Sequence, residues 1–366
     1  MLKENLIRAA LVVFGITVGL LAFEFGARLI PPSLLPIAAR QFIDSVSGIA
    51  PGRRPYLIDP QLGFIYKPAT DYTVEHPDST FRIKTNLNTE HAGFRGGTRA
   101  GPTWAVAVGD SFTFGVGVNQ EKTWEALLAD KIERDVVNLG VPGWAPQQYT
   151  LSLEKFGIPL NPKVIFYGLY ANDLADSVRF KNRGGRFDRF SARIFLRNNS
   201  IIVNLFKKLR RNKEVDSAAE IHLPEVGLRF SVDEVAQSFL KEGRYTDRGW
   251  ELIVREVARA AEASQKIDAK FVLLYFPSNK EVYWEQIKKK ASFPSVVEER
   301  VGAIRKRFAE LCQSRQLLCL DVTPALKQHA AQRKKLYFTI DAHWTESGHD
   351  VVANELYRFL SLNKML

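Results

Sequence analysis

Short apolar runs alternate with amphipathic stretches through the chain after residue 101. Five short, mainly apolar runs predict buried strands at Trp104–Val108, Val136–Leu139, Val164–Leu169, Phe271–Phe276 and Leu317–Leu320. Apolar residues at helical spacing predict helices at 123–134, 249–265, 295–313 and 346–360, and Thr345 is a suitable N-cap for the last of them. Strands that alternate with helices in this way indicate a parallel sheet covered on both faces, a three-layer α/β/α sandwich.

The first thirty residues carry a different pattern. Ala9–Phe23 contains no charged residue, and the apolar stretch extends to Ile30 if the two charged residues beyond it lie at a membrane surface. The length also suits a signal peptide, but no convincing cleavage site follows, and a buried amphipathic helix is a third interpretation. We interpret residues 1–30 as an uncleaved N-terminal transmembrane anchor. Lys3 and Arg8 precede the apolar stretch, so the distribution of positive charge slightly favours an extracytoplasmic position for the rest of the chain.

Two further segments interrupt the regular alternation. Residues 31–101 are rich in Pro, Gly, Asp and Asn, with short alternating pieces such as Phe81–Thr85, which predicts a linker followed by a small β-containing extension packed on the main domain. The main domain occupies residues 102–366. Within it, residues 177–245 lack strand–helix alternation and are expected to form a mostly helical or irregular insertion.

The positive charge of the chain is concentrated in one segment. The chain has 366 residues, 51 Lys and Arg and 40 Asp and Glu, for a net charge of +11. Arg179–Lys213 holds twelve basic residues and one acidic residue, so removing it leaves 39 of each sign. Apolar residues at 201, 202, 205, 206 and 209 form a helical stripe there, opposite four Lys and Arg. This basic segment is a solvated face, a contact for anionic lipid, or a contact for an anionic polysaccharide. No recognition motif for nucleic acid accompanies it.

The candidate chemistry lies in loops after the predicted strands. Ser111 follows the first strand, and Asp341 and His343 lie near the end of the chain. A serine hydroxyl can attack an acyl carbon, a histidine can take and return its proton, and an aspartate can hold the imidazole in the useful tautomer. In an extended segment, residues i and i+2 share a face, so Asp341 can reach His343. The alternative reading of this pair as half of a metal site finds no other His or Cys cluster to complete it.

Four short blocks in this order resemble the SGNH, or GDSL-type, hydrolases. They are Gly109-Asp110-Ser111-Phe112-Thr113-Phe114-Gly115, Asn138-Leu139-Gly140-Val141-Pro142-Gly143, Gly168-Leu169-Tyr170-Ala171-Asn172-Asp173 and Asp341-Ala342-His343. The resemblance implies a flavodoxin-like fold, a nucleophile at Ser111, and oxyanion donors at Gly143 (backbone N–H) and Asn172 (side-chain amide). A tetrahedral intermediate needs such preorganised donors.

The last block departs from the commoner family pattern. The family usually has two residues between Asp and His, whereas this chain has one, a spacing similar to that of acyltransferase-like and membrane-anchored branches. An Asn88…Gly93-Phe94-Arg95 element before the first block also resembles bacterial membrane-anchored members. The resemblance therefore implies a single-pass protein of the bacterial cytoplasmic membrane whose catalytic domain is periplasmic.

The resulting functional hypothesis is a membrane-anchored serine ester hydrolase that needs no cofactor. It would remove O-acyl groups, acetyl among them, from a cell-surface carbohydrate or lipid. Acyl transfer to a polysaccharide hydroxyl by the same Ser–His–Asp triad is one alternative, and a non-catalytic anchored protein that binds acidic polymers is the other. Two points stay open: Cys312 and Cys319 form a disulfide or are two small core residues, and Trp344 lines the substrate site or belongs to the core.

Overall fold

The computed structural model describes residues 55–182 apart from 58 and 77, residues 220–366, and a few helical positions between Arg8 and Gly26. No helix in this described part is long and apolar enough to cross a membrane. The predicted anchor at 1–30 lies largely outside the described residues. The predicted apolar stripe at 201–209 lies wholly outside them, as does most of the basic segment.

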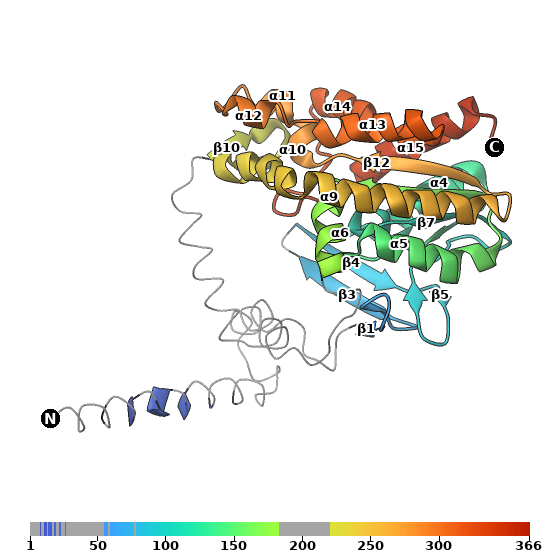
Figure 1. Cartoon of the computed structure of the whole chain (residues 1–366), viewed down its shortest axis with the longest axis horizontal. Helices are drawn as coiled ribbons and strands as arrows, with labels where there is room; N and C mark the ends of the chain where they lie inside the picture. Colours follow the sequence, from blue (N-terminus) through green and yellow to red (C-terminus); the bar gives the residue numbers. More distant parts are fainter. Residues whose placement is uncertain are drawn as a thin grey trace. The chain divides into compact units, whose positions relative to one another are not determined.

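A five-stranded parallel sheet forms the centre of the main domain (Figure 1). Its strands are β7 (Thr103–Val108), β8 (Asp135–Asn138), β9 (Val164–Tyr170), β12 (Lys270–Phe276) and β13 (Leu318–Asp321). Each predicted strand is confirmed to within one residue at either end. The spatial order β8-β7-β9-β12-β13 is the flavodoxin-like order, in which loops at the carboxyl edge collect around the first and third strands.

Alternate residues of each strand enter two separate cores, because successive side chains of a strand point to opposite faces. In β7, Ala105 and Ala107 belong to one core and Val106 and Val108 to the other. The first core is covered by α4 (Trp124–Ile132), α14 (Thr323–Ala331) and α15 (Glu346–Leu362). The second is covered by α5 (Pro146–Ser152), α9 (Val232–Gln265) and α13 (Ala303–Arg315). The predicted three-layer sandwich with a parallel sheet is therefore confirmed.

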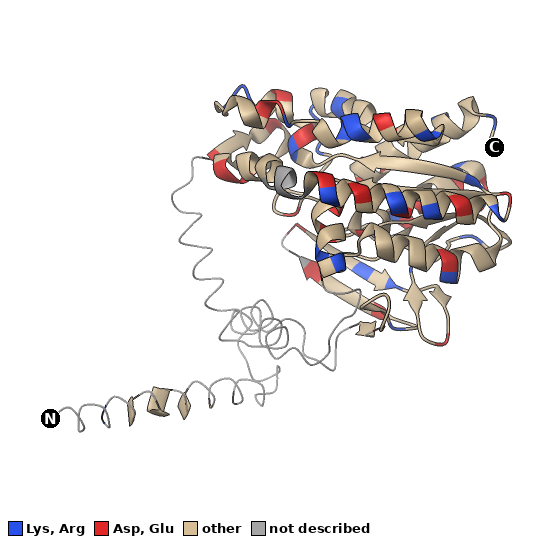
Figure 2. Ribbon diagram, viewed as in Figure 1, with Lys and Arg blue, Asp and Glu red and all other residues tan. Residues whose placement is uncertain are grey.

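The charge distribution agrees with these layers. Figure 2 shows charged residues of both signs along α9, whereas the central strands contain few. Strands buried on both faces have no solvent-facing position for a charged group, and helices keep one polar face.

Two predicted helices have different boundaries in the structure. The helix predicted from Gly249 begins at Val232, where Ser231 caps it. Gly249 is no boundary: a β-carbon there would lie 2.5 Å from the Leu174 carbonyl oxygen, so the glycine lets α9 approach α6 (Asp173–Asn182). The helix predicted at 295–313 is interrupted, since Gly302 adopts φ +78° before α13 and leaves a short α12 (Ser295–Glu298). The final helix and its Thr345 cap are confirmed.

The predicted insertion contains a hairpin that was not expected. Strands β10 (Glu220–Leu223) and β11 (Leu228–Ser231) pair antiparallel and are joined by a single 3-10 turn at Pro224–Val226. The physical cause is a period of two within each strand: Ile221, Leu223, Leu228 and Phe230 are buried, and His222 and Arg229 are exposed. The four apolar side chains join the core that α4 and α15 cover.

The N-terminal extension consists of short antiparallel strands. They are β1 (Tyr56–Leu57), β2 (Ile65–Tyr66), β3 (Asp71–His76), β4 (Ser79–Lys84), β5 (Leu87–Asn88) and β6 (Gly93–Phe94). Gly96 exchanges two backbone hydrogen bonds with Asn138 of β8, at 3.0 and 3.1 Å. Phe94 and Ile83 enter the same core as α5 and α9. The extension and the main domain thus share one core.

Three further α-helices of the described residues are single turns: α3 (Ser111–Phe114), α10 (Asn279–Val282) and α11 (Trp284–Ile287). Cys312 of α13 and Cys319 of β13 form a disulfide bond. The sequence left open whether these cysteines are bonded or are two small core residues, and the structure shows that they are bonded.

Candidate active site

Ser111 is the first residue of α3, directly after the carboxyl end of β7. Asp110 is the N-cap, and its Oδ1 accepts a hydrogen bond from the Phe112 N–H at 2.9 Å. The Ser111 hydroxyl donates to the other oxygen of Asp110 at 3.4 Å, the long limit for such a bond. Gly109 makes the turn possible, because a β-carbon at that position would lie 2.0 Å from Thr113 Oγ1.

His343 and Asp341 lie in the loop between α14 and α15. The His343 ring is hydrogen-bonded through Nδ1 to Asp341 Oδ1, which also accepts the backbone N–H of His343 at 3.1 Å. The two side chains are 22% and 21% exposed, so a substrate can reach them. With Nδ1 bound to the carboxylate, Nε2 is the ring nitrogen left for proton transfer.

The structure brings this pair to the nucleophile turn. The rings of Phe112 and His343 are 5.1 Å apart between centroids, and Phe112 is the neighbour of Ser111. Asp110, the other neighbour of Ser111, also lies within electrostatic reach of His343: burial raises the pKa of Asp110, and His343 opposes this rise. Trp344 is fully buried against Phe112 and Phe276, and therefore belongs to the core under the site.

The two predicted oxyanion donors lie in exposed loops at the same carboxyl edge of the sheet. Gly143 has φ +79° in the turn after β8, and Asn172 follows β9 by two residues. Among the described residues, neither the Gly143 N–H nor the Asn172 side-chain amide has a hydrogen-bond partner. Both donors can therefore bind a substrate oxygen.

Comparison with known proteins identifies the family. Residues 107–351, well over half of the chain, match the GDSL-like Lipase/Acylhydrolase family. The chain belongs to this family. It is accordingly an enzyme of the esterase and lipase class, as the sequence predicted. A comparison with curated protein sequences gives no match.

Solved structures of GDSL-type enzymes are similar to the chain at low identity. A protein assigned to the G-D-S-L lipolytic family from Desulfitobacterium hafniense is 15% identical, with TM-score 0.40, over 70% of this chain and 99% of that one. A mutant acetylxylan esterase from Geobacillus stearothermophilus is 11% identical, with TM-score 0.38, over 72% and 95%. The esterase EstA from a Pseudoalteromonas species is 14% identical, with TM-score 0.37, over 72% and 99%.

In this GDSL-type enzyme, one tyrosine connects the two loops that carry Gly143 and Asn172. The buried Tyr149 hydroxyl lies 2.6 Å from Asp173 Oδ1 and 3.1 Å from the Trp144 carbonyl oxygen. A hydroxyl has one proton to donate. The contact with Asp173 is the shorter one, so the hydroxyl donates its proton chiefly to that carboxylate. Burial raises the pKa of Asp173 well above its usual value, and the bond from Tyr149 opposes the rise. Sequence reasoning missed this link, although Asp173 stands beside Asn172 in the third block.

Replacing Tyr149 by Phe is expected to lower kcat about 10- to 100-fold and to leave KM within about twofold. Removing one oxyanion donor altogether lowers kcat about 10²- to 10³-fold. The effect expected here is smaller because this change displaces the donors without removing them. The free energy of unfolding should fall by about 1–3 kcal/mol. Kinetics with an acyl ester and denaturant unfolding measure both quantities. Tyr275→Phe is the matched control, since Tyr275 also donates to a buried carboxylate, Glu281, at 2.8 Å. Equal loss of kcat in both variants would contradict a positioning role.

Asp110, beside the nucleophile, has a raised pKa. Burial is the main cause, and the Phe112 N–H and His343 oppose it, so that the pKa is about 6. The folded state then binds a proton more tightly than the unfolded state does. The stabilisation by this proton is fully present below the ordinary pKa of 3.8 and is lost as the pH rises through about 6.

Asp110→Asn keeps a capping side chain but cannot titrate. We expect the unfolding free energy of the wild type, relative to that of this variant, to fall by about 1–3 kcal/mol as the pH rises from about 4 to about 7, since each pKa unit is worth about 1.4 kcal/mol. Parallel denaturant titrations of the two proteins measure it. A difference that stays constant with pH would rule out a raised pKa at Asp110.

The N-terminal extension also reaches this GDSL-type site. Asp78, in the turn of the β3–β4 hairpin, accepts the backbone N–H groups of Ile340 and Asp341 on one oxygen, at 2.6 and 2.9 Å. Thr339 donates to the Gly227 carbonyl oxygen of the β10–β11 hairpin at 2.8 Å. Two hairpins thus hold the loop that carries Asp341. The only sequence signal for this contact is that Asp78 occupies a turn between alternating segments.

Proposed function

We propose that the protein is a membrane-anchored serine ester hydrolase that removes O-acyl groups, acetyl among them, from a cell-surface carbohydrate or lipid through an acyl-enzyme. The observation that carries this proposal is the Asp341–His343 pair against Phe112, the residue after Ser111. This arrangement supplies a base, its orienting carboxylate and a hydroxyl on the first turn of a helix.

The proposed reaction has two steps. Ser111 Oγ attacks the acyl carbon as His343 Nε2 takes its proton, and the oxyanion is held by the Gly143 N–H and the Asn172 amide. The bond to the alcohol oxygen then breaks, and that oxygen receives the proton from His343. Water repeats the sequence on the acyl-enzyme, so that the acid leaves and Ser111 regains its hydrogen. The bond from Ser111 to Asp110, at 3.4 Å, is long enough to be exchanged readily for one to His343.

Two features support the proposed location. The Cys312–Cys319 disulfide is typical of an oxidising compartment such as the periplasm. The uncharged stretch Ala9–Phe23 supports the N-terminal anchor in a bacterial cytoplasmic membrane. The basic segment Arg179–Lys213 would then face anionic lipid or polysaccharide.

Acyl transfer to a polysaccharide hydroxyl is a second candidate. The single residue between Asp341 and His343 favours it, since acyltransferase-like relatives have a similar spacing. The same groups act in the first step, and a sugar hydroxyl replaces water in the second.

Incubation of the full chain with p-nitrophenyl acetate, with and without oligosaccharide, tests these proposals. Release of p-nitrophenolate above the buffer rate, with an acetyl adduct on the acid-quenched protein, is the result expected for either enzyme. Acetylated oligosaccharide in the mass spectrum would favour transfer, and free acetate alone would favour hydrolysis. A release rate equal to that of buffer would contradict both and favour the non-catalytic binding protein.

A further inference from the structure

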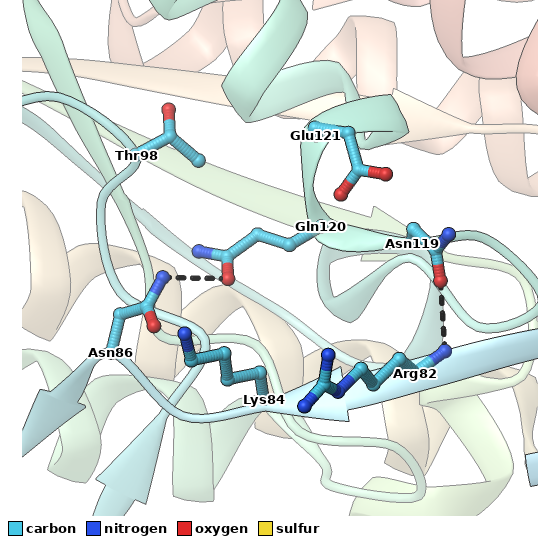
Figure 3. Close-up of a pocket in the computed structure, with 7 residues that line it drawn as sticks. All are labelled: Arg82, Lys84, Asn86, Thr98, Asn119, Gln120 and Glu121. Atoms are coloured by element: carbon cyan, nitrogen blue, oxygen red, sulfur yellow. Dashed lines mark hydrogen bonds between the residues drawn. The ribbon is translucent and has the colours of Figure 1, made fainter. Parts of the chain in front are cut away.

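A polar hollow of about 370 Å³ lies between strand β4 and the segment that follows the nucleophile helix (Figure 3). All of its lining residues are polar or charged. Three are amides, Asn86, Asn119 and Gln120, β4 contributes Arg82 and Lys84, and Thr98 and Glu121 complete the lining. These side chains offer hydrogen-bond donors and acceptors to a ligand rich in hydroxyl groups, and the two cations outnumber the one carboxylate.

The amides are fixed in place by the protein. Asn86 donates to Gln120 Oε1 at 2.8 Å, and Gln120 donates to the Arg95 carbonyl oxygen at 2.7 Å. The Arg82 backbone N–H donates to Asn119 Oδ1 at 2.8 Å. Among the described residues, the side-chain oxygen of Asn86 and the side-chain nitrogen of Asn119 have no hydrogen-bond partner. One acceptor and one donor are therefore left for a ligand. Such preorganised groups lose little entropy on binding.

Lys84 adds a second cation to the hollow. Its cross-strand neighbour is Asp71, but the Asp71 carboxylate pairs with both ends of the Arg82 guanidinium. Within the part of the chain that the structure describes, Lys84 therefore forms no ion pair, and it is exposed at the hollow. Its ammonium group suits a carboxylate on a hydroxyl-rich ligand.

Strand β4 connects this hollow with the candidate active site. Asp78, just before the strand, binds the backbone of Ile340 and Asp341, and Arg82 lines the hollow four residues later. A strand rises about 3.3 Å per residue, so Asp78 and Arg82 are about 13 Å apart along the strand. Thr80, Arg82 and Lys84 form the exposed face of β4. Asn119, at the other wall, follows α3 by five residues.

We propose that this hollow is a binding subsite for the acylated polysaccharide, specifically an acidic one. The amides hold sugar hydroxyl groups, Lys84 holds a sugar carboxylate, and the chain follows β4 so that an acyl ester reaches Ser111. This inference rests on the proposed ester hydrolase function.

The test compares Lys84→Glu with the full wild-type chain on two substrates, an O-acetylated oligogalacturonide and p-nitrophenyl acetate. KM for the oligogalacturonide is expected to rise about tenfold or more with kcat unchanged, because a lost ground-state contact changes KM alone. Hydrolysis of the small ester should stay within about twofold. Lys289→Glu, the same charge change on an exposed lysine after α11, is the control and should change neither. An unchanged KM in Lys84→Glu would overturn the subsite.

Binding of the deacetylated oligogalacturonide to the Ser111→Ala chain separates this inference from the function on which it rests. Weaker binding after a further Lys84→Glu change supports the subsite even if no ester is hydrolysed. Equal binding by both proteins, with ester hydrolysis intact in the wild type, rejects the subsite and leaves the hydrolase proposal standing. Neutral O-acetylated xylo-oligosaccharides that bind equally well and respond equally to Lys84→Glu would contradict the carboxylate contact.

Discussion

Ser111→Ala is expected to lower kcat/KM for an acyl ester by about 10⁴- to 10⁶-fold, since loss of a nucleophile removes covalent catalysis altogether. The residual rate would come from the oxyanion donors at Gly143 and Asn172. Stability should change little, because within the described part of the chain the hydroxyl makes a single long hydrogen bond, to Asp110. Steady-state kinetics with p-nitrophenyl acetate and a thermal unfolding curve measure both effects.

The control for this variant is Ser152→Ala. Ser152 is fully buried on α5, and its hydroxyl has no hydrogen-bond partner among the residues that the structure describes, so removing that oxygen changes volume and polarity in the same way. It should leave kcat/KM within about twofold. If Ser111→Ala retained the wild-type rate, Ser111 would not be the nucleophile.

Asp341→Asn is expected to lower kcat about 10³- to 10⁴-fold at neutral pH and to change KM little. An amide of the same shape cannot hold the imidazole in the required tautomer or stabilise the imidazolium ion. Asp341 Oδ1 also accepts the backbone N–H of His343, and an asparagine oxygen can keep this bond. The loop should therefore stay folded while the proton transfer fails.

Asp350→Asn provides the comparison for this second variant. It removes the same charge from an exposed position on α15 and should leave kcat unchanged. A kcat reduced less than tenfold in Asp341→Asn would show that another group orients His343, and the Asp341–His343 pair would lose its assigned role.

The sheet could be predicted from the sequence because its strands are buried on both faces. A strand such as Val164–Tyr170 then reads as one continuous apolar run with clear ends. The predicted helix boundary was wrong where a residue's role depends on a partner far away in the sequence. Gly249 looks like a helix break in the sequence, and only its contact with Leu174 shows that it belongs inside α9. The β10–β11 hairpin was missed because each strand offers only two apolar positions.

The residues of the candidate site also fall into a group that the sequence could predict and a group that it could not. Ser111, Gly143, Asn172 and the Asp341–His343 pair lie in short local motifs, so residue type and order were enough to select them. The groups that support them are linked only by the fold. Tyr149 reaches Asp173 across 24 residues, and Asp78 reaches Asp341 across 263. No local pattern marks a hydroxyl or a turn carboxylate for such a contact, because its partner is set by how the layers pack.

A fluorophosphonate probe, followed by mass-spectrometric mapping of the labelled peptide, tests the activated hydroxyl most directly and needs no knowledge of the substrate. Ser111 is predicted to be the single labelled residue in the full chain, and labelling should be lost in a folded His343→Ala variant. Labelling at a different serine, or none at all in the folded protein, would contradict the assignment of Ser111 as a nucleophile activated by His343.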